Sequence, residues 1–171
     1  PDFDSRMKKV CRTLIEQIDT LSEISNEFSN FAKMPAEKVE TLNLEELSRS
    51  AIQLFDQTKN VQFRFENQCP FEPFIRGDRN QMLRVFTNLF KNAVQAIPED
   101  RLGLIEVKIF PEGSDIVISI SDNGEGIPDE MQKKIFQPNF TTKSSGMGLG
   151  LAMVKNIVMA MSGTIWFETE S

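Results

Sequence analysis

The sequence has 171 residues, 40% of them hydrophobic, which predicts one compact domain with a sizeable core. Its formal net charge of −6 argues against nucleic acid or an anionic membrane as the main partner. No apolar run is long enough to span a membrane, and the absence of histidine removes the commonest general base and metal ligand.

Residues 4–32 are expected to form one long helix, because apolar side chains recur at steps of three and four residues. This apolar stripe consists of Met7, Val10, Cys11, Leu14, Ile18, Leu21, Ile24, Phe28 and Phe31. Its length and width predict half of a helical hairpin or a coiled coil that dimerises; a helix folded back on the domain is the alternative. Residues 33–43 are polar and contain Pro35, so we expect a linker there.

Helices and strands are expected to alternate after the linker. The helices are expected from residue 44 with Asn43 as cap, over 79–97 with Asp78 as cap, over 129–135 and over 149–161. The strands are expected at 61–65, 74–75, 105–110, 116–121 and 164–169. Because consecutive strands are expected to form hairpins, we predict an α/β two-layer sandwich with a mixed sheet and helices on one face.

Two glycine clusters, at 122–128 and 146–151, suggest a nucleotide held at its base and at its phosphates. Asp122 follows an apolar strand, and an ionised carboxylate suits the exocyclic amine of adenine but repels the carbonyl of guanine. This favours ATP over GTP, whereas the alternative is a local Asx-turn. The second cluster opens a helix, where free amides favour phosphate, and the alternative is a mobile turn.

Polar side chains near these clusters could complete a nucleotide site. Arg84, Asn88 and Asn92 share one face of the helix over 79–97, and amide oxygens suit Mg²⁺ already surrounded by phosphates. Lys143, which follows Thr141 and Thr142, could place an ammonium on the terminal phosphate. No Walker A pattern occurs, so this is not a P-loop.

In this order, the motifs resemble the ATP-binding domain of two-component sensor histidine kinases, in the superfamily of gyrase B, Hsp90 and MutL. Residues 88–93 resemble the N box, 122–127 the G1 box, 136–143 the F box and 146–151 the G2 box. The turn at 161–165 resembles the Gly-Gly-x-Ile turn of the family. The F box and residues 27–32 look closest to the nitrogen-regulation subgroup.

The resemblance implies a Bergerat-type fold that binds ATP and Mg²⁺. Asn92 would hold Mg²⁺ with Asn88 close to the metal and phosphates, and Asp122 would bind adenine. Phe136 and Phe140 would anchor a lid, and Asn88 and Lys143 are the catalytic candidates. The remaining implied contacts to the nucleotide are Gly124, Gly126, Ile127, Thr141, Thr142, Gly146, Gly148, Gly150 and Leu151.

The resemblance also divides the chain into the second helix of a dimerisation and phosphotransfer hairpin (1–32), a linker (33–43) and a catalytic domain (44–171) whose relatives end with a further strand. Its implied partners are the histidine-bearing helix of the same full-length kinase, a response regulator and a second copy through residues 4–32. The implied location is the cytoplasm, as the cytosolic part of a membrane-associated sensor.

Three departures bear on the activity. The chain has no histidine, so it cannot phosphorylate itself on one, and Gln95 stands where many relatives have a phosphate-binding lysine. Lys143 or Arg84 is expected to compensate. Hydrolases of the superfamily have a glutamate one turn before the metal-binding asparagine, whereas Asn88 cannot accept a proton. Phosphotransfer is therefore predicted, with a nucleotide-sensing pseudokinase and a superfamily ATPase as alternatives.

Overall fold

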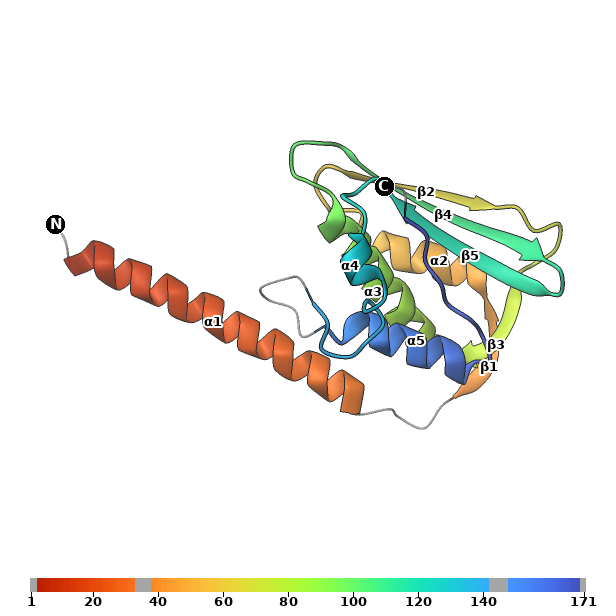
Figure 1. The fold of residues 1–171 in the computed structure, drawn as a ribbon, viewed down its shortest axis with the longest axis horizontal. Coiled ribbons are helices and arrows are strands. Elements are labelled where there is room, and N and C mark those ends of the chain that lie inside the picture. Colours follow the sequence, from red (N-terminus) through yellow and green to blue (C-terminus); the bar gives the residue numbers. More distant parts are fainter. Residues whose placement is uncertain (1–2, 33–37, 142–147, 170–171) are drawn as a thin grey trace.

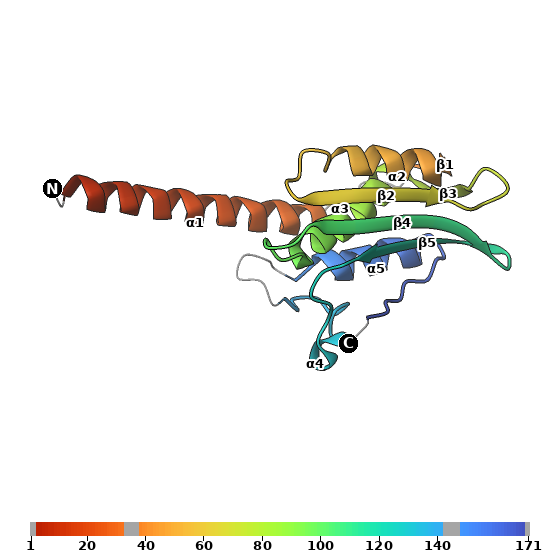
Figure 2. The same ribbon diagram turned by 90° about the horizontal axis from the view of Figure 1, so that it is seen from above.

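The computed structural model describes residues 3–32, 38–141 and 148–169. It consists of a long helix, α1 (Phe3–Ala32), and an α/β lobe made of the described residues from 38 onward (Figure 1). Helix α1 extends away from the lobe in both views (Figures 1 and 2). Within these ranges, no helix combines the length and apolar character that a membrane span requires.

Helix α1 confirms the long helix predicted from the apolar periodicity. Its large apolar side chains between Met7 and Leu21 are 47–64% exposed, and Cys11 is exposed as well. The side chains of Ile24, Phe28 and Phe31, which complete the predicted stripe, lie outside the described ones. The described part of the stripe is therefore not covered by the lobe.

A three-stranded mixed sheet forms one layer of the lobe, in the order β2 (Val61–Asn67), β4 (Gly103–Glu112) and β5 (Asp115–Asp122). Strand β2 runs parallel to β4, and β4 pairs with β5 in an antiparallel hairpin. The mixed sheet was predicted, but the hairpin expected between strands 61–65 and 74–75 does not form. Parallel neighbours need a long crossover, and here the connection between β2 and β4 contains a helix.

A second, two-stranded antiparallel sheet pairs β1 (Val39–Asn43) with β3 (Phe74–Asp78), from Val39 opposite Asp78 to Asn43 opposite Phe74. The prediction of a linker is therefore wrong for residues 39–43. The reason is tertiary: β3 supplies the backbone partners, and Leu42 is buried in the core. Neither contact is visible in the local polar pattern.

Helices α2 (Leu44–Gln53), α3 (Arg79–Ala96) and α5 (Gly150–Ala160) lie on one face of the three-stranded sheet (Figure 2). Asn43 and Asp78 cap α2 and α3 as predicted. The main core between the layers contains Leu42, Leu44, Leu47, Ala51, Met82, Phe86, Phe90, Val107 and Ile109. The ring of Phe90 lies at its centre, 5.2–5.9 Å from the rings of Phe55, Phe63 and Phe86.

Two predictions near the end of the chain need correction. Helix α4 (Asp129–Gln132) is shorter than the helix expected over 129–135, because turns follow it. Residues 164–169 do not form the expected strand, since within the described ranges no strand pairs with them. They instead contact the segment after β5, where the backbone N–H of Ile127 donates to Oγ1 of Thr169 at 3.2 Å.

Candidate functional site

Helix α3 forms the frame of the candidate site. It carries Arg84, Asn88 and Asn92 at four-residue spacing, so all three lie along one face, and all three are half-buried. Another face of the helix is fixed in the core by Phe86 and Phe90. Packing of the apolar face therefore determines where the polar face points.

Asp78 fixes the start of this helix and connects it to the beginning of the lobe. Its carboxylate accepts hydrogen bonds from the backbone N–H groups of Gln81 (3.0 Å) and Lys38 (2.9 Å). These bonds, that from Gln81 first, lower the pKa of Asp78, and the charge of Arg84 lowers it further. Arg84, which the sequence suggests as a phosphate contact, therefore also stabilises the charged form of the residue that caps α3.

Asn88 faces the first residue of α5. Its Nδ2 donates to the carbonyl oxygen of Arg84 at 2.9 Å, within α3. Its Oδ1 lies so near Gly150 that a Cβ at that position would be 2.8 Å away. Only glycine allows this approach without a shift of the neighbour, so the structure brings the N box and the second glycine cluster together.

Gly148 shows a second close approach in the same cluster. Its φ of +66° lies in the left-handed region that favours glycine, and a Cβ there would be 2.4 Å from the carbonyl oxygen of Phe140. The F box and the second glycine cluster are therefore in backbone contact. Gly148 and Gly150 lie where free amides at the start of α5 can face a phosphate.

The first glycine cluster packs against the other end of α3. The backbone N–H of Glu125 donates to the carbonyl oxygen of Ala96 at 3.0 Å, and a Cβ on Gly124 would be 2.6 Å from that same oxygen. Asp122 ends β5 and is exposed, and its Oδ1 accepts from the N–H of Gly124 at 2.9 Å. The Asx-turn proposed as the alternative reading thus exists, and it also orients the carboxylate.

Asn123 was not predicted as a site residue, although it makes more hydrogen bonds than its neighbours in the cluster. Its side chain joins the turn to the backbone of Leu102 and Leu104, and its carbonyl oxygen accepts from Arg101. An asparagine directly after the strand, before a glycine, is the sequence signal of such a contact. That signal identifies a turn but not the distant backbone groups that the side chain reaches.

Aromatic and polar contacts connect the expected base of the lid to the end of the chain. The ring of Phe136 lies 6.1 Å from that of Phe167, and Nζ of Lys155 lies 5.9 Å from the centre of the Phe136 ring. Ile127 contributes the backbone hydrogen bond to Thr169 described above. These contacts place Phe136 beside residues 164–169 and the side chain of Lys155.

The structure does not describe every residue that was predicted for the site. Thr142, Lys143 and Gly146 lie outside the described residues. Gly126 has a φ of +73°, and Leu151 is half-buried in the first turn of α5. Thr141 is exposed at the end of the F box.

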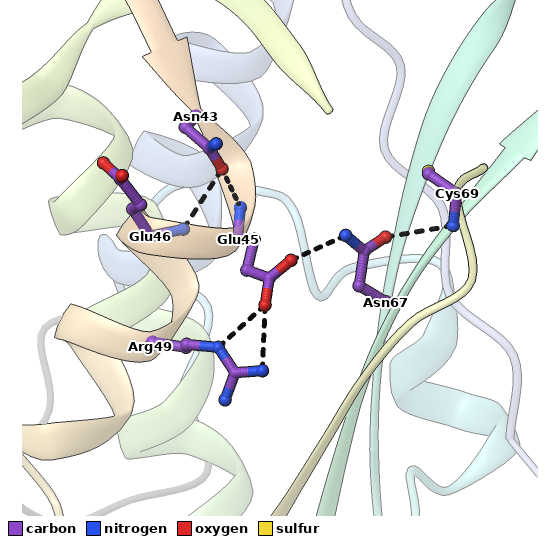
Figure 3. A network of polar contacts seen from close by, with 6 residues as sticks. All are labelled: Asn43, Glu45, Glu46, Arg49, Asn67 and Cys69. Carbon is purple, nitrogen blue, oxygen red and sulfur yellow. Dashed lines mark hydrogen bonds and ion pairs between the residues drawn. The ribbon is translucent and has the colours of Figure 1, made fainter. Parts of the chain in front are cut away.

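A separate polar network lies at the C-terminal end of β2, where Asn67 contacts α2 (Figure 3). Asn67 donates to Glu45 at 2.7 Å and accepts from the backbone N–H of Cys69 at 3.0 Å, while Arg49 donates to Glu45 at 2.9 Å. The bond from Asn67, followed by that from Arg49, lowers the pKa of Glu45. The adjacent hollow of about 500 Å³ is lined by none of the predicted site residues, so this network belongs to the framework.

The chain resembles histidine kinases in both sequence and structure. Residues 77–171 match the family of histidine kinase-, DNA gyrase B- and HSP90-like ATPases. The nitrogen regulation protein NtrY of Azorhizobium caulinodans is 33% identical over 158 residues, which are 90% of this chain and 20% of that protein. The sensor histidine kinase ZraS of Escherichia coli K12 is 34% identical over 160 residues, which are 92% of this chain and 34% of that protein.

Solved structures of histidine kinases have the same fold. A nucleotide-free catalytic domain of the histidine kinase ThkA is 32% identical and gives a TM-score of 0.65, covering 72% of this chain and 82% of that one. A structure of ThkA in complex with the response regulator protein TrrA gives 0.72 at 27% identity, covering 95% of this chain and 46% of that one. The chain spans only about a fifth to a third of the curated relatives described above.

Proposed function

Since the chain belongs to the family of histidine kinase-, DNA gyrase B- and HSP90-like ATPases, we propose that it transfers the γ-phosphate of ATP to a histidine outside its 171 residues. The chain is homologous to sensor histidine kinases and carries an ATP-binding domain of their type. The transfer itself and the identity of the acceptor are the proposal.

One observation carries this proposal: helix α3 contacts both glycine clusters, Gly150 through Asn88 and Gly124 through Ala96. At a rise of 1.5 Å per residue, these two contacts are about 12 Å apart along the helix. A nucleotide lying along α3 would then have its base beside Asp122 and its phosphates beside Gly148 and Gly150. The three segments are distant in sequence, so a purely local turn does not account for their meeting.

The residues present also fit ATP and Mg²⁺. Gly148 and Gly150 let the backbone before and at the start of α5 approach Phe140 and Asn88 closely, where a side chain would collide. We propose that Asn92 holds the metal, with Asn88 beside it, because amide oxygens suit this hard cation. Bound Mg²⁺ would neutralise charge on the phosphates that develops during transfer.

The chain's own contribution to the reaction is proposed to be positioning. The carboxylate of Asp122 would accept from the adenine amine, and the amides at the start of α5 would orient the phosphates. Lys143 is a proposed phosphate contact, and so is Arg84, although the charge of Arg84 also acts on Asp78. Phe136 and Phe140 would support the lid. The proposed nucleotide contacts also include Gly126, Ile127, Thr141, Thr142, Gly146 and Leu151.

Transfer is favoured over hydrolysis because Asn88 cannot act as a general base toward water. The acceptor is proposed to be the histidine-bearing helix of the same full-length kinase, which then signals to a response regulator. ThkA, which is structurally similar to this chain, is described in complex with such a protein. We further propose that α1 pairs with a second copy, and that the whole kinase is a membrane-associated sensor with this part in the cytoplasm.

The test combines this chain with a separately made first helix that bears the histidine, in the presence of ATP and Mg²⁺. Phosphohistidine on the added helix is expected, with ATP bound in preference to GTP. Asn92→Ala should abolish transfer, whereas Asn156→Ala, which changes an exposed asparagine of α5, should leave it intact. ATP binding and helix pairing without phosphohistidine would favour the pseudokinase, and rapid ATP hydrolysis by this chain alone would favour the ATPase.

A further inference from the structure

We propose that Asn123 is a positioning residue, which holds Asp122 at the distance from α3 that nucleotide selection requires. This inference rests on the proposed function, because it concerns the turn that would bind adenine. Asn123 itself needs no contact with the ligand.

Asn123 joins the first glycine cluster to the start of β4 and the two residues before it by four hydrogen bonds. Its Oδ1 accepts from the N–H of Leu104 at 2.8 Å, and its Nδ2 donates to the carbonyl oxygen of Leu102 at 3.0 Å. Its backbone N–H donates to the carbonyl oxygen of Leu104 at 3.2 Å. Its own carbonyl oxygen accepts from a guanidinium nitrogen of Arg101 at 3.0 Å.

These bonds continue the β4–β5 ladder beyond its last pair, Ile105 opposite Asp122. The chain must leave the sheet at this point to form the glycine turn. The side chain of Asn123 offers a donor and an acceptor where the next strand residue would offer backbone groups. The turn therefore begins directly after Asp122, and its first residue, Asn123, is still hydrogen-bonded to β4.

Both sides of the turn are anchored to rigid elements. On one side, the N–H of Gly103 donates to the carbonyl oxygen of Asn60 at 2.7 Å, where β2 begins to pair with β4. On the other side, Ala96 of α3 accepts from Glu125 and leaves no space for a side chain on Gly124. Because α3 also carries Asn88 and Asn92, these anchors set the separation between Asp122 and the phosphate end.

The experiment measures two affinities by calorimetry with the 171-residue chain and Mg²⁺: one for ATP, and one for purine riboside 5′-triphosphate, which lacks the 6-amino group. Asp122 can distinguish these ligands only if its carboxylate is correctly placed. Asn123→Ala is expected to weaken ATP binding about tenfold, the change that one net hydrogen bond is worth. It should leave the analogue nearly unaffected, so that the ratio of the two affinities falls.

Asn67→Ala is the matched control, because Asn67 also makes two side-chain hydrogen bonds (Figure 3) but lies at the opposite end of the β2–β4 pairing from the turn. It should leave the ratio unchanged. If Asn123→Ala does not fold, Asn123→Asp is used to test the inference. This variant keeps the acceptor for the N–H of Leu104 but loses the donor to Leu102, so it should lower the ratio of the two affinities only partially.

An equal loss for both ligands, or no loss, in the Asn123 variants would overturn the inference while the proposed function stands. A wild-type chain that binds ATP without preferring it to the analogue would overturn both the role of Asp122 and the inference. A wild-type chain that binds neither would overturn the proposed function itself, and with it the inference.

Discussion

Helices α1 and α3 have the same type of apolar periodicity but opposite environments. The apolar side chains of α3, from Met82 to Ala93, include five that are at most 5% exposed, whereas those of α1 from Met7 to Leu21 are about half exposed or more. A periodic stripe predicts that a helix needs an apolar partner, but not whether the same chain provides it. The lobe provides that partner for α3, and the exposed stripe of α1 is the basis for proposing a second copy.

The largest effect on stability is expected from a substitution that breaks the packing of α3. Phe90→Ala should lower the free energy of unfolding of the lobe by about 3–5 kcal/mol, because Phe90 is fully buried among three other rings. Urea unfolding, followed by the fluorescence of Trp166, the single tryptophan, measures this change. Leu14→Ala in α1 should change the same transition by less than about 0.5 kcal/mol. Equal losses would show that α1 packs on the lobe after all.

A smaller effect is expected from charges on the α1 stripe. Leu14→Glu combined with Ile18→Glu should weaken self-association at least about a hundredfold, since each buried aliphatic side chain contributes roughly 1.5–3 kcal/mol. Sedimentation across a range of concentrations measures it. The control is Lys9→Glu combined with Thr13→Glu, which has the same four-residue spacing outside the stripe. A wild-type chain that remains a monomer at high concentration would contradict the proposed dimer.

The smallest expected effect concerns the cap that begins α3. Asp78→Ala should cost about 1 kcal/mol at neutral pH. Because the pKa of Asp78 is lowered on folding, its contribution is complete above the ordinary aspartate pKa of about 3.9 and is lost as the pH falls further. Urea unfolding over the acid range should therefore show the difference from wild type shrinking. Asn43→Ala removes the equivalent, non-titrating cap of α2, and its cost should not follow this pH dependence.

Much of the lobe could be predicted because its signals are local. The apolar period, Asp78 as cap and Pro98 as terminator define α3, and alternation defines β4 and β5. Strand β1 was missed because its pairing with β3 is a long-range contact. The partner of β2 was misjudged for the same reason: the nearest strand in sequence was expected, whereas the fold supplies β4 across a helix.

In the candidate site, too, local features could be predicted from the sequence and long-range contacts could not. Glycine clusters and helical spacing predict Asp122, Gly148, Gly150 and the polar face of α3 as site residues from the sequence. The contact of Gly124 with Ala96 and the anchoring of Asn123 could not be read there, because each depends on backbone groups brought together by the fold. Motifs thus predicted which residues would face a ligand, but not what holds them.

The parallel pairing of β2 with β4 has a consequence for the order of folding. The β4–β5 hairpin closes over a short local turn, so it can form within microseconds. Strand β2 is synthesised earlier, yet its partner follows only after β3 and the whole of α3. We therefore expect β2 to leave the ribosome unpaired and to join the sheet late, as the strand pairing of the described lobe that closes the longest loop.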